Sequence, residues 1–361
     1  MTSVANLDPE ARRKLTKSLE IFRDDELMED CPLIGYPSGW HVAAWSHEVP
    51  PGKVLPVHYF GQDLVVWRGE SGDAVVMDAH CPHMGCHFAV GAVGHPLESG
   101  GTVGDTIQCP FHGWRFDTNG NNVEIPYSKH LNKVKARVWP TREIHGRFIL
   151  VWYDPEGGQP QWEPRPIPEL EQPEQWFLGH DEIGWQYWEE MRQPGPCGAE
   201  NAVDAGHAFY VHGFEAMNSR VIESDGPFWV SEFDTTFRNR KGEKVGDGHI
   251  LMEHWGMTIM VHRINGGARN TIQIFAGTPT RGWNTVLRGM AFVQRMDGEH
   301  EPPPIVKVIT NRQLHTGNED MGLFKRLRYV KRPPYAPEEA RNMLTMRRWF
   351  TQFYLQREDF F

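Results

Sequence analysis

Between about residue 39 and residue 154, short apolar runs alternate with turn residues. The runs at 64–68, 74–77 and 148–152 are rich in Val, Leu, Ile and Trp, and Gly, Asp and Pro separate them. Short runs of β-branched and aromatic residues bounded by turn residues are typical of strands. This part of the chain therefore predicts an antiparallel β domain of about 120 residues.

The pattern changes on both sides of this β domain. Residues 1–30 are charged and amphipathic, and the Pro-rich stretch at 155–173 predicts a connection without regular structure. Beyond it we expect a helix at 198–212, strands at 226–238, 248–262, 270–278 and 285–295, and helices near 318–328 and 337–355. The expected fold class is α+β, with a helical arm (1–35), a β domain (36–157) and a domain of helices and antiparallel sheet (158–361).

Composition excludes several partners. The net charge of −10 and the pI near 6.0 argue against nucleic acid or an anionic membrane surface as the main partner. The chain has no apolar run of about 18 residues that would predict a membrane span, and its charged start lacks the apolar core of a signal peptide. Five irregularly spaced cysteines do not suggest a secreted disulfide framework, so we expect a cytoplasmic protein.

Two short segments each contain a cysteine followed by a histidine two or three residues later. Cys81 and His83 belong to CPHMGCH, and Cys109 and His112 belong to CPFHGW. A Rieske [2Fe–2S] cluster has two thiolates on one iron and two imidazoles on the other, and two such loops supply them. A tetrahedral zinc site has the same ligand composition and is the alternative, although zinc ribbons pair cysteine with cysteine.

His207 and His212 form a second candidate metal site. With one carboxylate they fit a 2-His-1-carboxylate triad, which leaves positions on Fe(II) open. Their spacing places them about 140° apart on an ideal α-helix, so joint chelation requires a break or a widening of the helix. Asp204 is expected to orient the His207 imidazole. Because the chain has 18 histidines, a chance pair is the alternative.

The carboxylate ligand is expected from residues 314–325. There an acidic pair, Glu319 and Asp320, is predicted to open an amphipathic helix. Asp320 is the favoured ligand and Glu319 is the rival. A salt-bridging surface pair without metal is the alternative to both.

Together these residues resemble the Rieske non-haem iron oxygenases, and most of all the oxygenase component of 3-ketosteroid 9α-hydroxylase and related sterol-modifying enzymes. The resemblance covers most of residues 36–357. Besides the metal motifs, it rests on Gly39–His41, Phe60–Val66, Ile125–Tyr127, Val151–Gly157 and Met346–Tyr354.

The resemblance implies a Rieske domain followed by a helix-grip-like catalytic domain. The implied ligands are Cys81, His83, Cys109 and His112 for the [2Fe–2S] cluster and His207, His212 and Asp320 for a mononuclear Fe(II). Asp204 and Asn201 are the implied catalytic residues. The family further implies a homotrimer, in which His112 of one chain contacts Asp204 of the next, and a separate ferredoxin reductase that uses NAD(P)H and flavin.

The implied activity is that of a monooxygenase. Supplied electrons and O₂ would hydroxylate a C–H bond of a hydrophobic, polycyclic, steroid-like substrate of lipid metabolism. An aromatic-ring dioxygenase, an O-demethylase and, outside enzymes, a Rieske electron carrier are the alternatives. Five side chains either line a substrate pocket or form core: Met252, Trp255, Met257, Ile259 and Phe292.

The chain also departs from its relatives. Electron-transport Rieske proteins pair the counterpart of Cys86 with a cysteine in the second loop, but Phe111 stands there, so a free thiol is expected. The connection Ala89–Gln108 is long and rich in glycine, and a tolerated hairpin extension is the favoured interpretation. Gly113 stands where several steroid enzymes carry an acidic residue, which leaves the substrate open.

Overall fold

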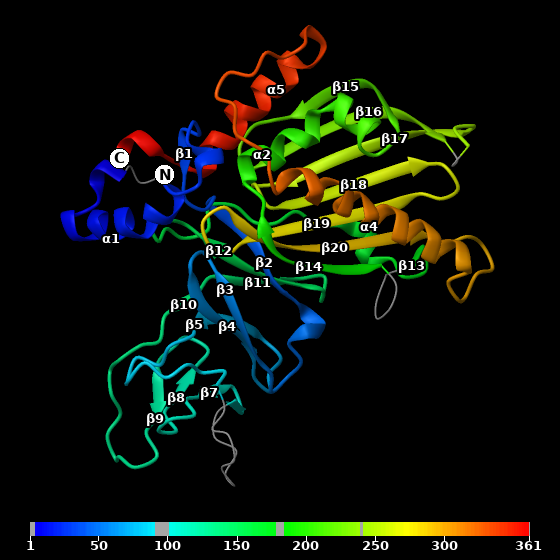
Figure 1. The fold of residues 1–361 in the computed structure, drawn as a ribbon. Helices are drawn as coiled ribbons and strands as arrows, with labels where there is room; N and C mark the ends of the chain where they lie inside the picture. The colour runs from blue at the N-terminus through cyan, green and yellow to red at the C-terminus, as the bar shows by residue number, and fades with distance from the viewer. Residues whose placement is uncertain (1–3, 91–100, 178–183, 239–240, 361) are drawn as a thin grey trace. The chain divides into compact units, whose positions relative to one another are not determined.

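The computed structural model describes residues 4–90, 101–177, 184–238 and 241–360 of the chain. They form two compact units (Figure 1). The small unit comprises residues 41–153, and the large unit comprises residues 1–40 and 154–361. The N-terminal residues therefore pack with the C-terminal part of the chain.

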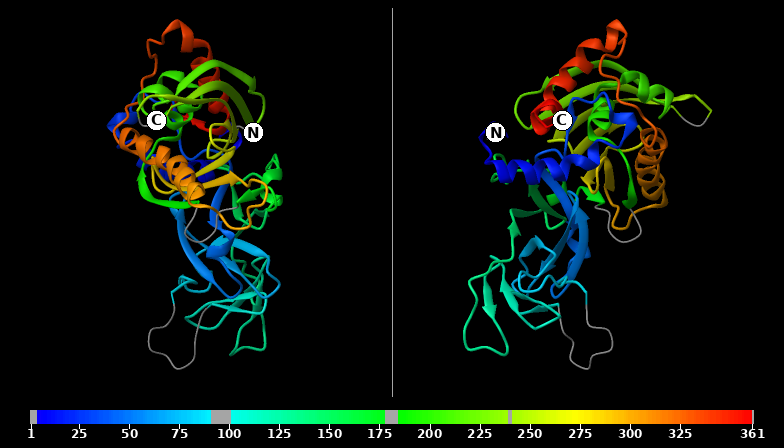
Figure 2. Two further views of the ribbon diagram at one scale, coloured as in Figure 1. Left: turned by 90° about the vertical axis from the view of Figure 1, so that its right-hand side faces the viewer. Right: turned by 60° about the vertical axis from the view of Figure 1, so that its left-hand side comes forward.

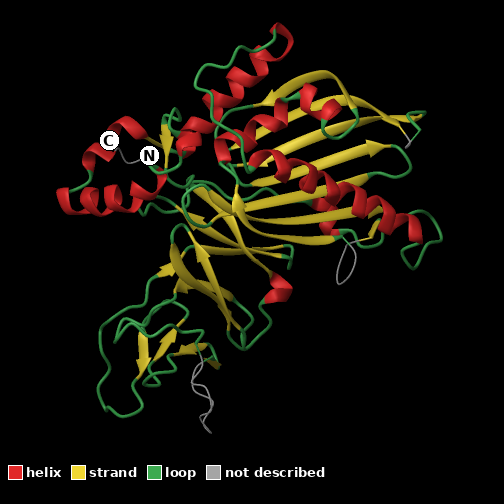
Figure 3. Ribbon diagram, viewed as in Figure 1, coloured by secondary structure: helices red, strands yellow, loops and turns green. Residues whose placement is uncertain are grey.

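The small unit consists of short antiparallel strands, as the sequence predicts (Figure 3). One sheet has the order β10–β5–β4–β3, a second has β11–β12–β2, and a third has β6–β7–β8–β9. The strands are β2 (Gly39–Trp45), β3 (Val54–Tyr59), β4 (Gln62–Arg68), β5 (Ala74–Asp78), β6 (Thr102–Val103), β7 (Thr106–Gln108), β8 (Arg115–Asp117), β9 (Asn122–Glu124), β10 (Val138–Trp139), β11 (Thr141–Ile144) and β12 (Phe148–Tyr153).

Turn chemistry and apolar alternation explain these strands. Phe60 and Gly61 have φ angles of 53° and 70° and join β3 to β4 in a tight hairpin, since positive φ at both turn positions matches the twist of the paired strands. Val65, Trp67 and Met77 point from β4 and β5 into one buried cluster that also contains the cysteine loops. Of the long Ala89–Gln108 connection, residues 91–100 lie outside the described residues, and β6 and β7 pair at its end.

The large unit is built on one antiparallel sheet, whose strands in the described chain have the order β13–β20–β19–β18–β17–β16–β15, with β14 paired to β20. The bounds are β13 (Trp176–Phe177), β14 (Trp185–Arg192), β15 (Glu215–Glu223), β16 (Phe228–Arg238), β17 (Lys244–Trp255), β18 (Ile259–Gly266), β19 (Thr271–Pro279) and β20 (Asn284–Gln294). The expected single strand at 248–262 is wrong. It is a hairpin of β17 and β18, which turns at Gly256 with a φ of 56°.

The helices of the described residues all belong to the large unit: α1 (Pro9–Leu19), α2 (Gly195–Ala199), α3 (Ala205–Tyr210), α4 (Pro304–Phe324) and α5 (Pro337–Phe350). The large unit also has 3₁₀ turns at Val4–Asn6, Glu20–Phe22, Glu26–Met28, Pro168–Glu171, Glu200–Val203, Thr351–Phe353 and Arg357–Asp359, and the small unit has one at Ser46–Glu48. α4 crosses one face of the sheet (Figure 2), where Leu314 and Met321 pack with Phe275 and Leu287. No helix in the described part of the chain combines the length and the apolar character that crossing a membrane requires.

Two of the expected helices differ from the structure. The expected helix at 198–212 is divided among α2, a 3₁₀ turn and α3. The helix that carries the acidic pair begins at Pro304, so Glu319 and Asp320 lie in its last turns and do not open it. Proline is favoured at the first position of a helix because its missing N–H is not needed there.

The two ends of the large unit meet in a short sheet. β1 (Leu33–Ile34) pairs with β21 (Leu355–Gln356) in antiparallel register. Arg357 reinforces this contact, because its side chain donates to the carbonyls of Glu29 and Phe22. The first 40 residues are thus held in place by the last ones.

Candidate metal centres and cavity

Two loops of the small unit share one backbone geometry. The N–H of Cys81 donates to the carbonyl five residues later at 2.9 Å, and the N–H of Gly85 donates back to Cys81 O at 2.9 Å. The same two bonds recur at Cys109 and Gly113, at 2.8 and 3.0 Å. Gly85 and Gly113 have φ angles of 73° and 72°, which glycine adopts without steric cost. The two loops are matching halves of one site.

The predicted ligands in these loops come together as two pairs. A hydrogen bond between the buried thiols lowers the pKa of Cys109 to about 6 and raises the pKa of Cys81. The ring centroids of His83 and His112 lie 4.8 Å apart, and Nδ1 of His112 is buried without a hydrogen-bond partner among the described residues. A thiolate pair beside an imidazole pair fits a [2Fe–2S] cluster of the Rieske type.

The surroundings of these loops agree with the expectation for Cys86. The structure describes all five cysteines, and each of them, Cys86 included, is a free thiol. Phe111 and Met84, at the tips of the two loops, are 58% and 64% exposed. The His83 ring stacks on Trp114 with a centroid separation of 4.2 Å, which fixes the plane of that imidazole.

In the large unit, α3 and the turn after it position the two other histidines. Asp204 precedes the helix as its N-cap, and its Oδ1 accepts the N–H of His207 at 2.9 Å, which satisfies one of the free amides of the first turn. This contact is with the main chain of His207. A hydrogen bond between Asp204 and the His207 imidazole stays a prediction.

The helix ends before His212. α3 stops at Tyr210, and Gly213, with a φ of 74°, donates its N–H to Phe209 O at 3.0 Å. This is the left-handed end typical of helices. The backbone between His207 and His212 is therefore not a regular α-helix, as the 140° argument requires, and the turn brings the second imidazole back beside the first.

Three donor atoms meet at one point. Nε2 of His207 lies 3.0 Å from Nε2 of His212, and Oδ1 of Asp320 lies 3.0 Å from the former and 3.2 Å from the latter. Metal–imidazole bonds of about 2.1 Å at right angles give donor separations of about 3.0 Å. The oxygen is buried, and neither imidazole is aligned with it as a hydrogen-bond donor. The donor set thus fits one face of an octahedral metal site.

Atoms around the three donors also have hydrogen-bond partners. Nδ1 of His212 lies 2.8 Å from Glu319 Oε2, and Arg312 donates to the other oxygen of Glu319 at 2.9 Å. A carboxylate on the far nitrogen fixes the tautomer of a metal-binding histidine and turns its other nitrogen to the metal. Asn201, from the 3₁₀ turn, has its Nδ2 3.3 Å from His207 Nε2. The geometry favours Asp320 over Glu319 as the ligand.

The pKa values of Asp320 and His212 shift in opposite directions. Burial works against the ionised form of Asp320, yet the two imidazoles hold the pKa of this carboxyl below its usual value. Burial likewise works against the charged form of His212, but Asp320 and Glu319 raise its pKa. An anionic donor and two imidazoles in a half-buried place attract a cation.

A cavity of about 340 Å³ opens beside the three donors. Apolar side chains dominate its walls, among them Phe233, Met252, Met257, Phe275 and Phe324. Of the side chains considered for a pocket, Met252 and Met257 line it. Trp255, Ile259 and Phe292 are buried in the core and are not part of this wall. The size is within the range of about 300–1,000 Å³ typical of small-molecule sites.

Sequence reasoning missed several polar residues of this cavity. His254 and His262 lie on β17 and β18, and Gln273 lies on β19. In the sequence nothing sets them apart, because His254 follows Glu253 and His262 precedes Arg263 in strands that carry other polar residues. Only the pairing of the strands shows that they face the same cavity as the metal donors.

Two protein families match the chain. The Rieske [2Fe-2S] domain matches residues 39–135, and the 3-ketosteroid 9alpha-hydroxylase C-terminal domain matches residues 151–354. The first match contains the two cysteine–histidine loops. The second contains both histidines and the acidic residue of the other site.

Curated relatives and solved structures agree with these matches. The chain is 27% identical over 352 residues to cholesterol 7-desaturase of Ciona intestinalis, covering 91% of this chain and 70% of that protein. It is 29% identical over 337 residues to the oxygenase component of 3-ketosteroid-9-alpha-monooxygenase of Rhodococcus rhodochrous, covering 89% and 83%. The structure of dicamba monooxygenase bound to dicamba shares the fold, with a TM-score of 0.66 at 18% identity, covering 88% of this chain and 98% of that one.

The second family match alone spans more than half of the chain. Together with the Rieske match and the two donor sets, it accounts for both units. The chain therefore belongs to the Rieske non-haem iron oxygenases, as an oxygenase component with a catalytic domain of the 3-ketosteroid 9α-hydroxylase type.

Proposed function

We propose that this oxygenase hydroxylates a C–H bond of a hydrophobic, polycyclic, steroid-like substrate, with O₂ and with electrons from a separate ferredoxin reductase. The observation that carries the proposal is the donor triangle of His207, His212 and Asp320 at the wall of an apolar cavity. Apolar walls bind a polycyclic hydrocarbon by removing its surface from water.

Each of the two donor sets would hold one metal group. Cys81, His83, Cys109 and His112 would hold the cluster, and His207, His212 and Asp320 would hold Fe(II). The cluster supplies electrons and the mononuclear iron supplies O₂ activation when both are bound.

The remaining side chains position these groups. Glu319 holds the His212 ring through Nδ1, and Asp204 keeps the first turn of α3 in place. Phe275 and Phe324 contribute apolar surface to the cavity wall, and a wall that keeps water out would protect the chemistry from side reactions.

A second candidate reaction is desaturation. A relative that covers 91% of this chain is a cholesterol 7-desaturase. Hydroxylation and desaturation both begin by removing a hydrogen atom from a C–H bond, so one site geometry serves either. They differ in the product, because only hydroxylation adds an oxygen atom.

The test is a product analysis. The iron-loaded protein is incubated with a ferredoxin reductase, NADH and isotopically labelled O₂, and each of a panel of sterols and ketosteroids is analysed by mass spectrometry. A product with one labelled oxygen supports hydroxylation, and loss of two hydrogens without label supports desaturation. Consumption of a methoxyarene or formation of a dihydrodiol, with all steroids untouched, would contradict the proposed substrate class. If protein with an intact cluster contains only about two iron atoms per chain, the chain would be an electron carrier instead.

A further inference from the structure

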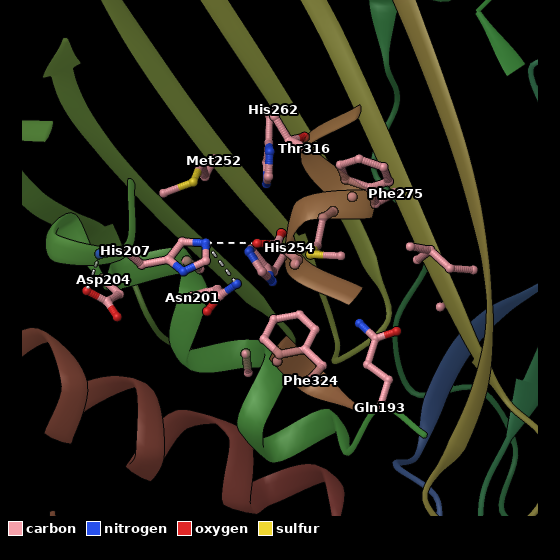
Figure 4. Close-up of a pocket in the computed structure, with 18 of the residues that line it drawn as sticks. Gln193, Asn201, Asp204, His207, Met252, His254, His262, Phe275, Thr316 and Phe324 are labelled. Atoms are coloured by element: carbon pink, nitrogen blue, oxygen red, sulfur yellow. Dashed lines mark hydrogen bonds and ion pairs between the residues drawn. The ribbon is translucent and has the colours of Figure 1, made fainter. Parts of the chain in front are cut away.

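Several buried polar atoms in the cavity wall have no role in either metal site, and one of them belongs to His262. His262 projects from β18 into the cavity beside Met252 and Thr316 (Figure 4). Its Nε2 atom is buried and has no hydrogen-bond partner among the described residues. A buried polar atom without a partner is costly, so this nitrogen is expected to meet a group of the bound ligand.

The neighbours of His262 determine which of its nitrogens carries the proton. Gln273 donates its Nε2 to the main-chain carbonyl of Gln313 and, at 2.9 Å, to Thr316 Oγ1. A carbonyl can only accept, so the amide nitrogen of Gln273 must point toward α4 and the amide oxygen must point away from it. That oxygen, Oε1, lies 3.3 Å from Nδ1 of His262.

It follows that His262 Nδ1 carries the hydrogen and donates it to Gln273. Burial lowers the pKa of His262 to about 4, and the contact with Gln273 offsets this only in part. The ring is therefore neutral near pH 7 and has one N–H, which is already used. Nε2 is left as a bare lone pair directed at the cavity.

We infer that His262 Nε2 accepts a hydrogen bond from a hydroxyl group of the substrate and that the enzyme therefore selects a hydroxysteroid over the corresponding ketone. This inference rests on the proposed function and narrows its substrate class. A hydroxyl can donate to the lone pair. A ketone oxygen has no hydrogen, so it would leave Nε2 unpaired and place two lone pairs against each other.

A preference for hydroxysteroids would distinguish between the substrates named for the two kinds of relative. Cholesterol carries a hydroxyl group, whereas a 3-ketosteroid carries a carbonyl in its place. The wall formed by His262, Gln273 and Thr316 suits the first. Sites built to pair a substrate hydroxyl reject the analogue without it strongly, so we expect a preference of at least about tenfold in Kd.

The experiment measures binding with three ligands that share one skeleton: cholestanol, cholestanone and cholestane. Quenching of tryptophan fluorescence gives Kd for the anaerobic, iron-loaded protein. Cholestanol is expected to bind at least about tenfold more tightly than cholestanone. His262→Phe should weaken cholestanol alone and bring the ratio of the two Kd values near one.

Gln273→Leu keeps the imidazole but removes the acceptor that fixes its tautomer. The ring can then present an N–H to the cavity, so cholestanone should gain affinity while cholestanol loses it. The matched control is His254→Phe on the neighbouring strand. His254 has a buried, unpartnered Nε2 as well, but no described contact fixes its tautomer, and its replacement should change both Kd values by a similar factor.

Several results would overturn the inference. Equal affinity of the native protein for cholestanol and cholestanone would do so, as would an equal loss for both ligands in His262→Phe that retains its iron and its melting temperature. If His262→Phe does not fold, an unchanged ratio in Gln273→Leu has the same meaning. Failure of all three ligands to bind, with turnover of a non-steroid in the product analysis, would overturn the steroid proposal and this inference together. Turnover of steroids without a hydroxyl preference would overturn the inference alone.

Discussion

At the scale of single residues, two adjacent carboxylates have different surroundings. Oδ1 of Asp320 lies beside both Nε2 atoms, whereas Glu319 contacts the outer nitrogen of His212 and is paired with Arg312. One residue is placed to bind the metal, and the other is placed to orient a ligand.

Replacing these carboxylates should separate the two roles. Asp320→Ala is expected to lose the mononuclear iron and to keep the visible spectrum of the [2Fe–2S] cluster, because the cluster ligands lie in the other unit. Glu319→Gln should keep the site but weaken metal affinity by about 10–100-fold, the effect typical of a residue behind a metal ligand. Metal analysis and titration with Fe(II) measure both. Full activity of Asp320→Ala combined with loss of iron in Glu319→Ala would reverse the assignment.

At Asp204, a substitution can separate the effect of the charge from the effect of the helix cap. Asparagine caps helices as well as aspartate does, so Asp204→Asn should keep α3 and both metal sites. It removes the charge that we propose couples neighbouring chains, and turnover should fall by at least about 10²-fold. Stopped-flow reduction of the cluster should be unchanged. Turnover near that of the native protein would remove Asp204 from the electron path, and loss of iron would assign it to assembly of the site.

At the scale of elements, the close approach of α4 to the sheet sets the position of Asp320. Gly317 lies against the ring of Trp188, where an added Cβ would be 3.0 Å from Cζ2, and Asn318 holds that ring through its Nε1. Gly322, on the same helix, has open space around it. The same helix therefore contains one tightly packed glycine and one glycine with free space, which can be compared.

Alanine at these two positions should have opposite effects. Gly322→Ala is expected to raise stability by up to about 1 kcal/mol, the helix preference of alanine over glycine. Gly317→Ala should lower stability, because the rigid ring cannot give way, and it should weaken iron binding by displacing Asp320. Thermal unfolding and metal titration test this. An increase in melting temperature for Gly317→Ala would show that the ring has room to move.

An ion pair fixes the turn between β18 and β19 to the segment after β20. The two terminal guanidinium nitrogens of Arg269 each lie 2.6 Å from an oxygen of Glu299, and this pairing lowers the pKa of Glu299 to about 2 from an ordinary value of 4.5. A depressed pKa contributes stability above the unfolded value that is lost on acidification. The melting temperature of the native protein should thus exceed that of Glu299→Gln above pH 4.5, and the difference should vanish by about pH 2. A constant difference throughout that range would contradict the ion-pair explanation.

Some of these elements could be predicted from the sequence and others could not. The cysteine–histidine loops could be predicted because their ligands and glycines are local. The break between His207 and His212 could be predicted because chelation forbids a regular helix. The hairpin at Gly256 was missed, since Trp255 and Met257 continue the apolar run on both sides of one glycine. The position of Asp320 near the end of α4 was missed because the signal for its start, Pro304, lies 16 residues earlier.

The wall around His262 could not be predicted from local pattern at all. Its residues come from β18, β19 and α4, and their relation depends on strand register and on the packing of a helix across the sheet. Periodicity indicates that a strand exists. It does not give the neighbour of a particular side chain.

At the scale of the whole molecule, we propose that chains assemble as a head-to-tail homotrimer in which the cluster of one chain serves the iron of the next. Two inactive variants test this. Cys81→Ser removes a cluster ligand and His207→Ala removes an iron ligand. Each alone should be inactive, but co-expressed chains should recover about one quarter of the native activity per chain, the share of interfaces that random mixing makes functional. Isolated mixed assemblies without activity would place the electron path inside one chain.

The pairing of β1 with β21 has a consequence for the order in which the protein is made. Residues 41–153 are continuous in sequence, so the small unit can fold, and acquire its cluster, while the ribosome is still translating the rest. Leu33 and Ile34 must wait for Leu355 and Gln356, which at about 5–20 residues per second takes roughly 15–65 s. Throughout that interval the nascent chain exposes an unpaired strand and the apolar side chains of Phe22 and Met28, which are buried in the finished protein. Chaperone dependence of the yield should therefore follow the integrity of the last strand more than that of the cluster loops.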